Sequence, residues 1–170
     1  MRKQRTEKGF SIMETMIASF VLVVGLVGTI AVFGSAIKFT GLSRDQVVAA
    51  ALAQEGIEIA KNIRDNNMLN GSFADGMTSG TYCVDYRDQA LSSCSNNGQL
   101  YVNSDHWYVR SVTSQKTLFK RKIVVDSSQT DTLKIKSYVV WRDGVFPSSP
   151  TACTLRQKCV FAQTVLTNWK

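Results

Sequence analysis

The hydrophobic and polar positions divide the chain into an uncharged apolar run, an amphipathic continuation and a series of alternating segments. From Met16 to Ile37, about 22 consecutive residues carry no charge. At 1.5 Å per residue an α-helix of this length spans roughly 33 Å, enough to cross a bilayer core of about 30 Å. The run therefore predicts a membrane-spanning helix.

The helical pattern continues beyond the apolar run, through 42–66. Four apolar residues recur there at spacings of four and seven, as expected for one face of a helix: Val48, Leu52, Ile59 and Ile63. No proline occurs before Pro147, although Gly41 and Gly56 each weaken a helix locally by up to about 1 kcal/mol. We expect one helix over 10–66, with its first half (about 16–37) in lipid and its second half covering a soluble core.

The rest of the chain, 67–170, has the pattern of a β-rich domain. Asn66–Asn67 and the turn signals after them predict the end of the helix, and a polar loop follows over Met68–Gly80. Apolar, aromatic and β-branched alternation then predicts strands. These are expected at Thr81–Arg87, Leu100–Val102, Trp107–Thr113, Leu118–Val125, Leu133–Arg142 and Val160–Trp169, with a loop at Ser92–Gly98. A helix followed by consecutive antiparallel strands is an α+β arrangement.

One predicted strand alternates clearly enough to suggest its two faces. In Lys134–Trp141 the inward set could be Ile135, Ser137, Val139 and Trp141. The outward set would then be Lys134, Lys136, Tyr138 and Val140. The reverse assignment is also open, since a shift of one residue exchanges the two faces.

Charges at the N-terminal end of the apolar run suggest both an orientation and a function. Four basic residues precede the run: Arg2, Lys3, Arg5 and Lys8. This bias places the N-terminus in the cytoplasm and the residues after Ile37 outside. Glu14 is a carboxylate at the start of the membrane helix. An acidic residue inside a membrane is costly, by up to about 2.5–3.5 kcal/mol when it lies at the bilayer centre. Such a residue suggests a function and a partner.

The stretch Lys8-Gly9-Phe10, with Glu14 as the fifth residue after Gly9 and an unbroken apolar helix behind it, resembles a type IV prepilin. The resemblance covers roughly 8–33. It implies that a membrane peptidase removes the leader 1–9 by cutting between Gly9 and Phe10 and then methylates the Phe10 amine. It also implies that Phe10 and Glu14 serve in assembly.

Within that family, the segment 23–28 is most similar to minor pilins of the pilus-modification type. Many major pilins carry a proline further along the helix, and none occurs in this one. The resemblance implies a pilin-like fold and a minor structural subunit of a type IV pilus or pseudopilus. The implied partners are other pilin subunits, prepilin peptidase, the inner-membrane assembly machinery and the membrane. The implied location is the inner membrane, single-pass, before assembly, and a cell-surface filament afterwards.

Three other readings of the N-terminal segment stay open. A secretory signal peptide needs a shorter apolar region and a small-x-small cleavage site. A plain single-pass anchor needs only the hydrophobic length, but it leaves Glu14 unexplained. A membrane-anchored extracellular domain that binds DNA or another ligand without filament assembly is the alternative function.

The four cysteines fit an exported domain. An even number of cysteines in an oxidising compartment predicts two disulfides among Cys83, Cys94, Cys153 and Cys159. Three connectivities are possible, and the pairing of neighbours, Cys83–Cys94 and Cys153–Cys159, is favoured because it closes the smallest loops. A four-thiolate zinc site is the rival, although neither pair has the spacing usual for zinc.

The charge balance leaves nucleic-acid binding as a minor hypothesis. The net charge is +7, and removal of the leader leaves 16 basic and 12 acidic residues, or +4. A possible DNA contact surface combines basic residues of two predicted strands, with Phe119 or Tyr138 near enough to stack bases. Its residues are Lys116, Lys120, Arg121, Lys122, Lys134 and Lys136. The same lysines also suit a solvated sheet face.

No residue pattern in the exported part predicts an enzyme. The single histidine, His106, has no second candidate base near it in sequence, and no phosphate loop or zinc-peptidase motif occurs. We therefore expect no catalytic residues, no cofactor and no metal site.

Overall fold

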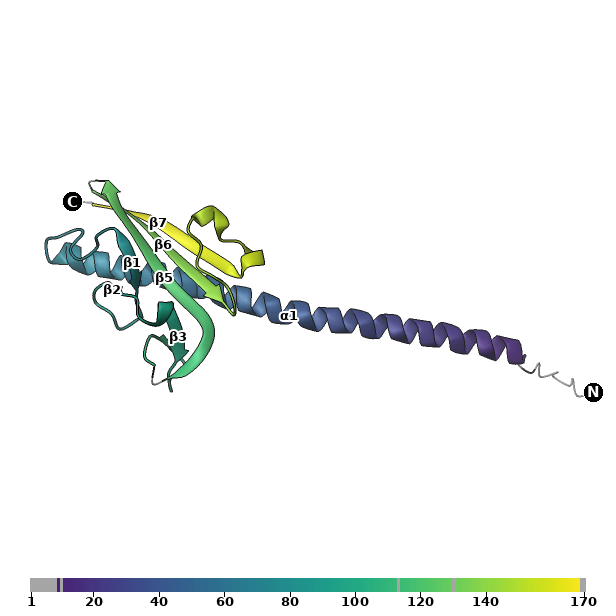
Figure 1. Ribbon diagram of the computed structural model, residues 1–170. Helices are drawn as coiled ribbons and strands as arrows, with labels where there is room; N and C mark the ends of the chain where they lie inside the picture. Colours follow the sequence, from purple (N-terminus) through teal and green to yellow (C-terminus); the bar gives the residue numbers. More distant parts are fainter. Residues whose placement is uncertain (1–8, 10, 113, 130, 169–170) are drawn as a thin grey trace, which may run out of the picture. The chain divides into compact units, whose positions relative to one another are not determined.

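The computed structural model describes residues 9, 11–112, 114–129 and 131–168. The chain divides into two compact units, 1–43 and 44–170, and the helix α1 (Ile12–Leu69) contributes to both (Figure 1). The C-terminal half of α1 packs on an antiparallel β-sheet. This is the α+β architecture that the sequence predicts.

In the first unit, α1 carries an apolar surface that none of the described residues of that unit covers. Every large apolar side chain from Ile12 to Phe39 is at least 55% exposed. Within the described part of the chain, α1 is the one helix that is long and apolar enough to cross a membrane. A helix that is hydrophobic on all sides belongs in lipid or against other helices.

The hydroxyl groups of this apolar segment are satisfied inside the helix. Thr15 Oγ1 donates to the carbonyl oxygen of Ile12 at 2.8 Å, and Ser19 Oγ donates to that of Met16 at 2.9 Å. Three further hydroxyls bond back in the same way, from Thr29, Ser35 and Thr40. Since lipid offers no hydrogen-bond partners, this internal pairing makes the segment compatible with a membrane.

The second unit contains a seven-stranded antiparallel sheet. Its strands are β1 (Gly80–Cys83), β2 (Ser92–Ser93), β3 (Gln99–Val102), β4 (Tyr108–Val109), β5 (Gln115–Gln129), β6 (Thr132–Trp141) and β7 (Cys159–Thr167). Short 3-10 helices occur at η1 (Asn96–Gly98), η2 (Pro150–Ala152) and η3 (Leu155–Gln157).

The long strand β5 organises this sheet. One of its edges pairs with β6 along most of its length, and β6 in turn pairs with β7. The other edge is shared by two short strands: β3 pairs with its beginning and β1 pairs with its middle. Strands β2 and β4 extend the sheet outward from β1 and β3.

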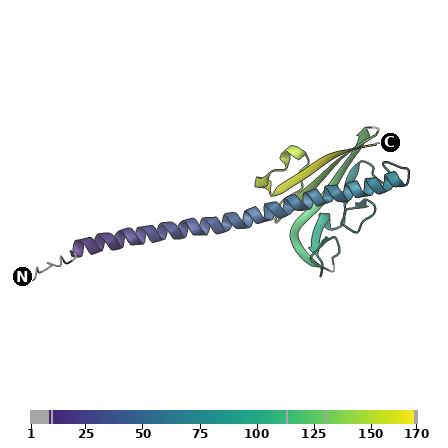
Figure 2. The same cartoon turned by 180° about the vertical axis from the view of Figure 1, so that it is seen from behind.

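The face of α1 that meets the sheet is built largely from small residues. Ala49, Ala53, Gly56 and Ala60 are buried there, together with Leu52, Ile57 and Ile63. Figures 1 and 2 show the strands on one side of this part of the helix. The predicted face was only half right. Leu52 and Ile63 are buried, whereas Val48 and Ile59 are half-buried, because the sheet approaches the helix over the small residues between them.

Most predicted strands are present with different bounds. The helix continues to Leu69 instead of ending near Asn66–Asn67. Strand β1 ends at Cys83 instead of Arg87, because Asp85 starts a hydrogen-bonded turn. Strand β4 is limited to Tyr108–Val109, while β5 extends well past both predicted ends. Strand β2 forms inside the predicted loop Ser92–Gly98, and Trp169 lies outside the described residues.

The first assignment of faces in β6 is confirmed. Ile135, Ser137 and Val139 are fully buried, and Trp141 is 2% exposed. Tyr138 and Val140, on the other face, are also buried, since they form a second cluster with Cys159 and with side chains of the loop 143–158. The C-terminal half of β6 is therefore covered on both faces.

Candidate functional site

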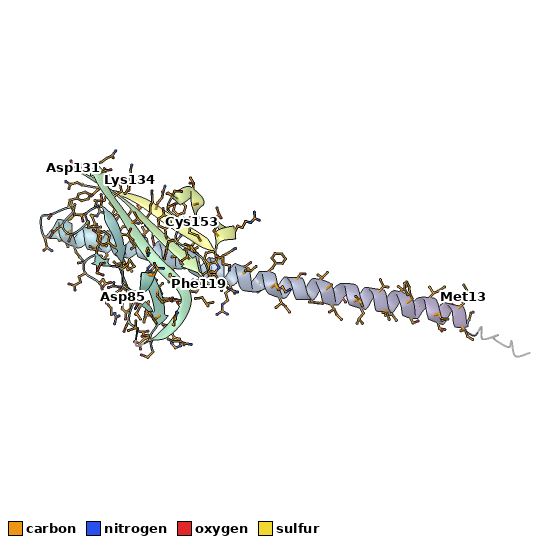
Figure 3. The ribbon with its side chains drawn as sticks, in the orientation of Figure 1. Met13, Asp85, Phe119, Asp131, Lys134 and Cys153 are labelled. Atoms are coloured by element: carbon orange, nitrogen blue, oxygen red, sulfur yellow. A yellow bond between two sulfur atoms is a disulfide. The ribbon has the colours of Figure 1, made fainter. Side chains whose placement is uncertain are left out.

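The helix α1 starts close to the predicted processing junction. The carbonyl oxygen of Ser11 accepts bonds from the backbone N–H groups of Glu14 and Thr15, which closes the first turn. Glu14 lies in that turn and is exposed, near the point where Met13 stands out from the helix (Figure 3). A carboxylate there interacts favourably with the positive end of the helix dipole. Gly9 is exposed, whereas Lys8 and Phe10 lie outside the described residues.

The glycines of the first unit are not required by packing within the chain. A Cβ atom added at Gly25, Gly28 or Gly34 would meet nothing within 4 Å. At about 100° per residue, Gly25, Gly28 and Ala36 lie within about 40° of the direction of Glu14, whereas Gly34 lies on the opposite side. Small residues thus follow the same side of the helix as Glu14, the one acidic residue in the described part of the first unit.

Both disulfides form between neighbouring cysteines. Cys83 at the end of β1 is joined to Cys94, and Cys153 is joined to Cys159 at the start of β7. This is the connectivity that the sequence favours, and it leaves none of the four thiols for a zinc site. The second disulfide closes the loop that covers Tyr138 and Val140.

Five of the six basic residues proposed for DNA contact lie on one face of the sheet. Lys116, Lys120 and Lys122 alternate along β5, and Lys134 and Lys136 lie on the same face of β6; Lys134 is labelled in Figure 3. The two aromatic residues expected near them are unsuited to stacking on bases. Phe119 is 7% exposed on the face toward α1, and Tyr138 is 6% exposed under the loop 143–158.

The prediction that the sixth residue, Arg121, contacts DNA is wrong, because its side chain is 2% exposed and points toward α1. Its Nη1 donates to the carbonyl oxygen of Leu52 at 3.0 Å and its Nη2 donates to that of Val84 at 2.9 Å. Nη1 also lies 3.1 Å from Glu55 Oε1. Arg121 therefore ties the helix to β5 and to the chain after β1. The sequence contains the signal, since Arg121 shares the apolar alternation of Phe119, Ile123 and Val125.

Two loops of the second unit bring together residues that no sequence pattern marks as a site. Tyr86, in the loop after β1, and Trp107, before β4, have ring centroids 5.5 Å apart. Their exposed fractions are 46% and 59%. Beside Tyr86 lies a groove of about 410 Å³ between this loop and α1.

The Tyr86 loop is held by a buried carboxylate, Asp85 (Figure 3). Asp85 Oδ1 accepts the backbone N–H of Arg87, and its Oδ2 accepts both Arg87 Nη2 and the backbone N–H of Arg110. Burial acts to raise the pKa of Asp85, but the bonds from Arg87 and Arg110 outweigh it and leave that pKa below its usual value. Asp88 adds an ion pair to Arg110 at 3.0 Å.

The described residues contain no group of three or more His, Cys, Asp or Glu side chains placed to hold a metal ion. His106 lies in the turn between β3 and β4, where its backbone N–H donates to the carbonyl oxygen of Asn103. No family model, curated protein or solved structure matches the chain.

Proposed function

We propose that the chain is a minor structural subunit of a type IV pilus or pseudopilus, with a pilin-like fold, that assembles through its N-terminal helix. Prepilin peptidase would remove the leader 1–9 between Gly9 and Phe10. Before assembly the subunit would be anchored in the inner membrane, with its N-terminus in the cytoplasm and the β-rich domain outside. The assembly machinery would then add it to a filament.

The single observation that carries this proposal is Glu14 in an otherwise uncharged apolar segment. The next basic residue along the helix is Lys38, 24 positions away, so the helix itself supplies no nearby cation. A carboxylate in low dielectric is costly unless it is paired. Cleavage after Gly9 would create a cationic amine on Phe10, which is the partner that Glu14 lacks.

Pairing between subunits gives Glu14 a structural task. Phe10 and Glu14 are four residues apart in the sequence, a spacing at which a pair within one chain is possible. The amine of an adjacent subunit is the more useful partner, because a buried polar pair between helices fixes their axial register. A subunit at the wrong height leaves both charges unpaired and is rejected.

The exposed helix surface supports close association. The apolar side chains of the first unit are exposed. Glycine is not required at positions 25 and 28 by contacts within the chain, because a Cβ atom there would meet nothing within 4 Å, and both positions are thus free to contact a neighbouring helix. Small residues let neighbouring helices approach closely in a membrane or a filament. Gly25 and Gly28 both lie on the side of the helix that carries Glu14.

The proposal is tested by determining where the mature protein is located and which residue forms its N-terminus. Mass spectrometry of sheared surface filaments should detect this chain, with Phe10 as its first residue and an N-methyl group on its amine. An intact Met1 in mature filaments would contradict the processing step. Recovery of the protein only from membranes, as a monomer, would favour the alternative, an anchored extracellular binding domain.

The lysine face of β5 and β6 is the observation that favours this alternative: Lys116 and Lys134 are exposed there, and three more lysines are half-buried. Lys120, Lys122 and Lys136 have no ion-pair partner among the described residues, apart from longer-range attraction between Lys136 and Asp126. A polyanion such as DNA could contact them, with weak and steeply salt-dependent binding because the mature chain carries only +4.

A further inference from the structure

The exposed aromatic pair, Tyr86 and Trp107, is carried by two turns whose backbone is held by hydrogen bonds. Asp85 and Asp88 fix the loop that carries Tyr86 through the bonds described above. The turn that carries Trp107 is fixed by Asn103, whose Oδ1 accepts the backbone N–H of Trp107 at 2.8 Å and whose own N–H donates to the Trp107 carbonyl oxygen at 3.1 Å. A ligand would therefore meet two rings on ordered backbone segments, one of which, Tyr86, also has the Arg87 guanidinium 5.7 Å from its ring centroid, and little entropy would be lost in ordering these segments.

The groove beside Tyr86 is polar but has almost no uncompensated charge. All four of its charged side chains have an ion-pair partner in the second unit. The pairs are Glu55 with Arg121, Glu58 with Lys61, Arg87 with Asp85, and Asp88 with Arg110. A charged ligand would have to break these pairs, so the groove suits a neutral molecule.

Planar amide groups complete the groove. Asn62 and Asn66 lie one helical turn apart on α1, and Asn66 Nδ2 donates to Asn62 Oδ1 at 2.9 Å. The remaining amide atoms of this pair present a donor and an acceptor, and Gln89 lies across the groove on the Tyr86 loop. Adjacent donors and acceptors of this kind match neighbouring hydroxyl groups, each of which both donates and accepts.

We propose that Tyr86, Trp107 and the adjoining groove form a binding site for a neutral saccharide. A sugar ring has an apolar C–H face, which stacks on an aromatic face, and a rim of hydroxyls, which needs amide and carboxylate partners. A groove of about 410 Å³ is within the usual range of small-molecule sites and has room for a short stretch of glycan. Exposed Tyr and Trp side chains that are not needed in the core are typical anchors of binding surfaces.

Two other ligand classes fit the same surface less well. A polyanion would meet the carboxylates of Glu55, Glu58 and Asp88 along the groove. A purely apolar ligand would displace water from the amide groups without offering them hydrogen bonds in its place, which is unfavourable. The inference does not depend on filament assembly, so it can fail while the proposed function stands, and the reverse also holds.

The test uses the full-length protein in a detergent without a sugar headgroup, since maltoside and glucoside detergents would compete for the site. Cellotriose, maltotriose, chitotriose and lacto-N-tetraose are titrated by saturation-transfer NMR and calorimetry. We expect at least one of them to bind with Kd on the order of 1 mM, and to receive magnetisation at ring C–H protons. Absence of binding by all four at about 10 mM would overturn the proposal.

Variants then locate the site. Tyr86→Ala and Asn62→Ala should each weaken binding by about tenfold, and Trp107→Ala by about three- to tenfold, because one stacking or hydrogen-bonding partner is lost. Leu155→Ala is the matched control, since Leu155 is 56% exposed in η3 and lies outside the groove. A melting temperature like that of the wild type shows that each variant is folded.

Two results would contradict the assignment. Saccharide binding that is unchanged in Tyr86→Ala and Trp107→Ala would place the ligand elsewhere. Binding of duplex DNA that these two substitutions abolish would show that the aromatic pair serves a polyanion instead.

Discussion

Gly56 on α1 and Ser137 on β6 approach so closely that the helix has no room for a side chain at position 56. A Cβ atom added there would collide with Ser137 Oγ and would lie 3.1 Å from Arg121 Cδ. Ser137 Oγ is itself buried without a hydrogen-bond partner. Gly56, which costs helix propensity, is thus retained where helix and sheet are in closest contact.

The first prediction concerns this contact. Gly56→Ala should lower the free energy of unfolding of the full-length protein by about 1–3 kcal/mol, because overpacking outweighs the propensity gain of up to about 1 kcal/mol. Denaturant unfolding in detergent measures the change. Gly41→Ala is the control, since a Cβ there meets nothing within 4 Å, and it should be neutral or slightly stabilising.

A double variant separates the collision from other effects of Gly56→Ala. Adding Ser137→Ala removes the hydroxyl that the new Cβ meets, so the pair should be less destabilised than the sum of the single changes. A Gly56→Ala protein as stable as the wild type would show that the contact relaxes without cost.

The second prediction separates Arg121 from its neighbour in sequence. Arg121→Met should destabilise the protein by about 2–4 kcal/mol, since the carbonyl oxygens of Leu52 and Val84 lose their donor and Glu55 loses its cation. Lys120→Met, on the outer face, should change stability by no more than about 0.5 kcal/mol. Equal effects of the two substitutions in urea unfolding would refute the structural role of Arg121.

The third prediction is a pH dependence from Asp85. Its pKa is lower in the folded protein than its ordinary value of 3.8, so the folded state binds fewer protons than the unfolded state. The stabilisation is therefore complete well above pH 3.8 and is lost as the pH falls through the folded pKa.

Asp85→Asn tests this directly. The variant should be less stable than the wild type by about 1–3 kcal/mol near neutral pH, and the difference should shrink between about pH 5 and pH 3. Asp105→Asn, an exposed residue of the next loop, is the control. Thermal unfolding at several pH values measures both, and a gap that stays constant down to pH 3 would exclude Asp85 as the titrating group.

The fourth prediction concerns assembly. Glu14→Ala should be inserted, cut after Gly9 and folded outside, yet should enter filaments at least about tenfold less than the wild type, because the amine of its neighbour is left unpaired. Glu14→Asp keeps the charge with a shorter reach and should be partly tolerated. Quantitative blots of sheared filaments measure incorporation.

Thr15→Ala serves as the matched control for Glu14. Thr15 is adjacent, and its hydroxyl is already bonded to the carbonyl oxygen of Ile12, so the loss of this group should leave incorporation unchanged. Filaments that take up Glu14→Ala as readily as the wild type would remove the main physical support for the pilin reading.

The sequence alone determined the features that depend on neighbouring residues. The long helix follows from an uninterrupted helical pattern without proline, and the two faces of β6 follow from its alternating residues, although the burial of the tertiary structure decided which face points toward α1. The disulfides follow from loop closure between cysteines that are close along the chain. In each case a local regularity fixes the outcome.

Only the tertiary structure decided the features that depend on distant partners. In the sequence, Lys120, Arg121 and Lys122 form one basic cluster. The pleat of the strand turns Arg121 to the opposite face from the two lysines. There it donates hydrogen bonds to the carbonyl oxygens of Val84 and Leu52, about 40 and 70 positions away in the chain. Tyr86 and Trp107 lie in different loops, and they meet because Asp85 bonds to the backbone at Arg110. Gly56 is needed because β6 comes to lie against it. Such contacts depend on how the chain closes over long separations, which no local pattern records.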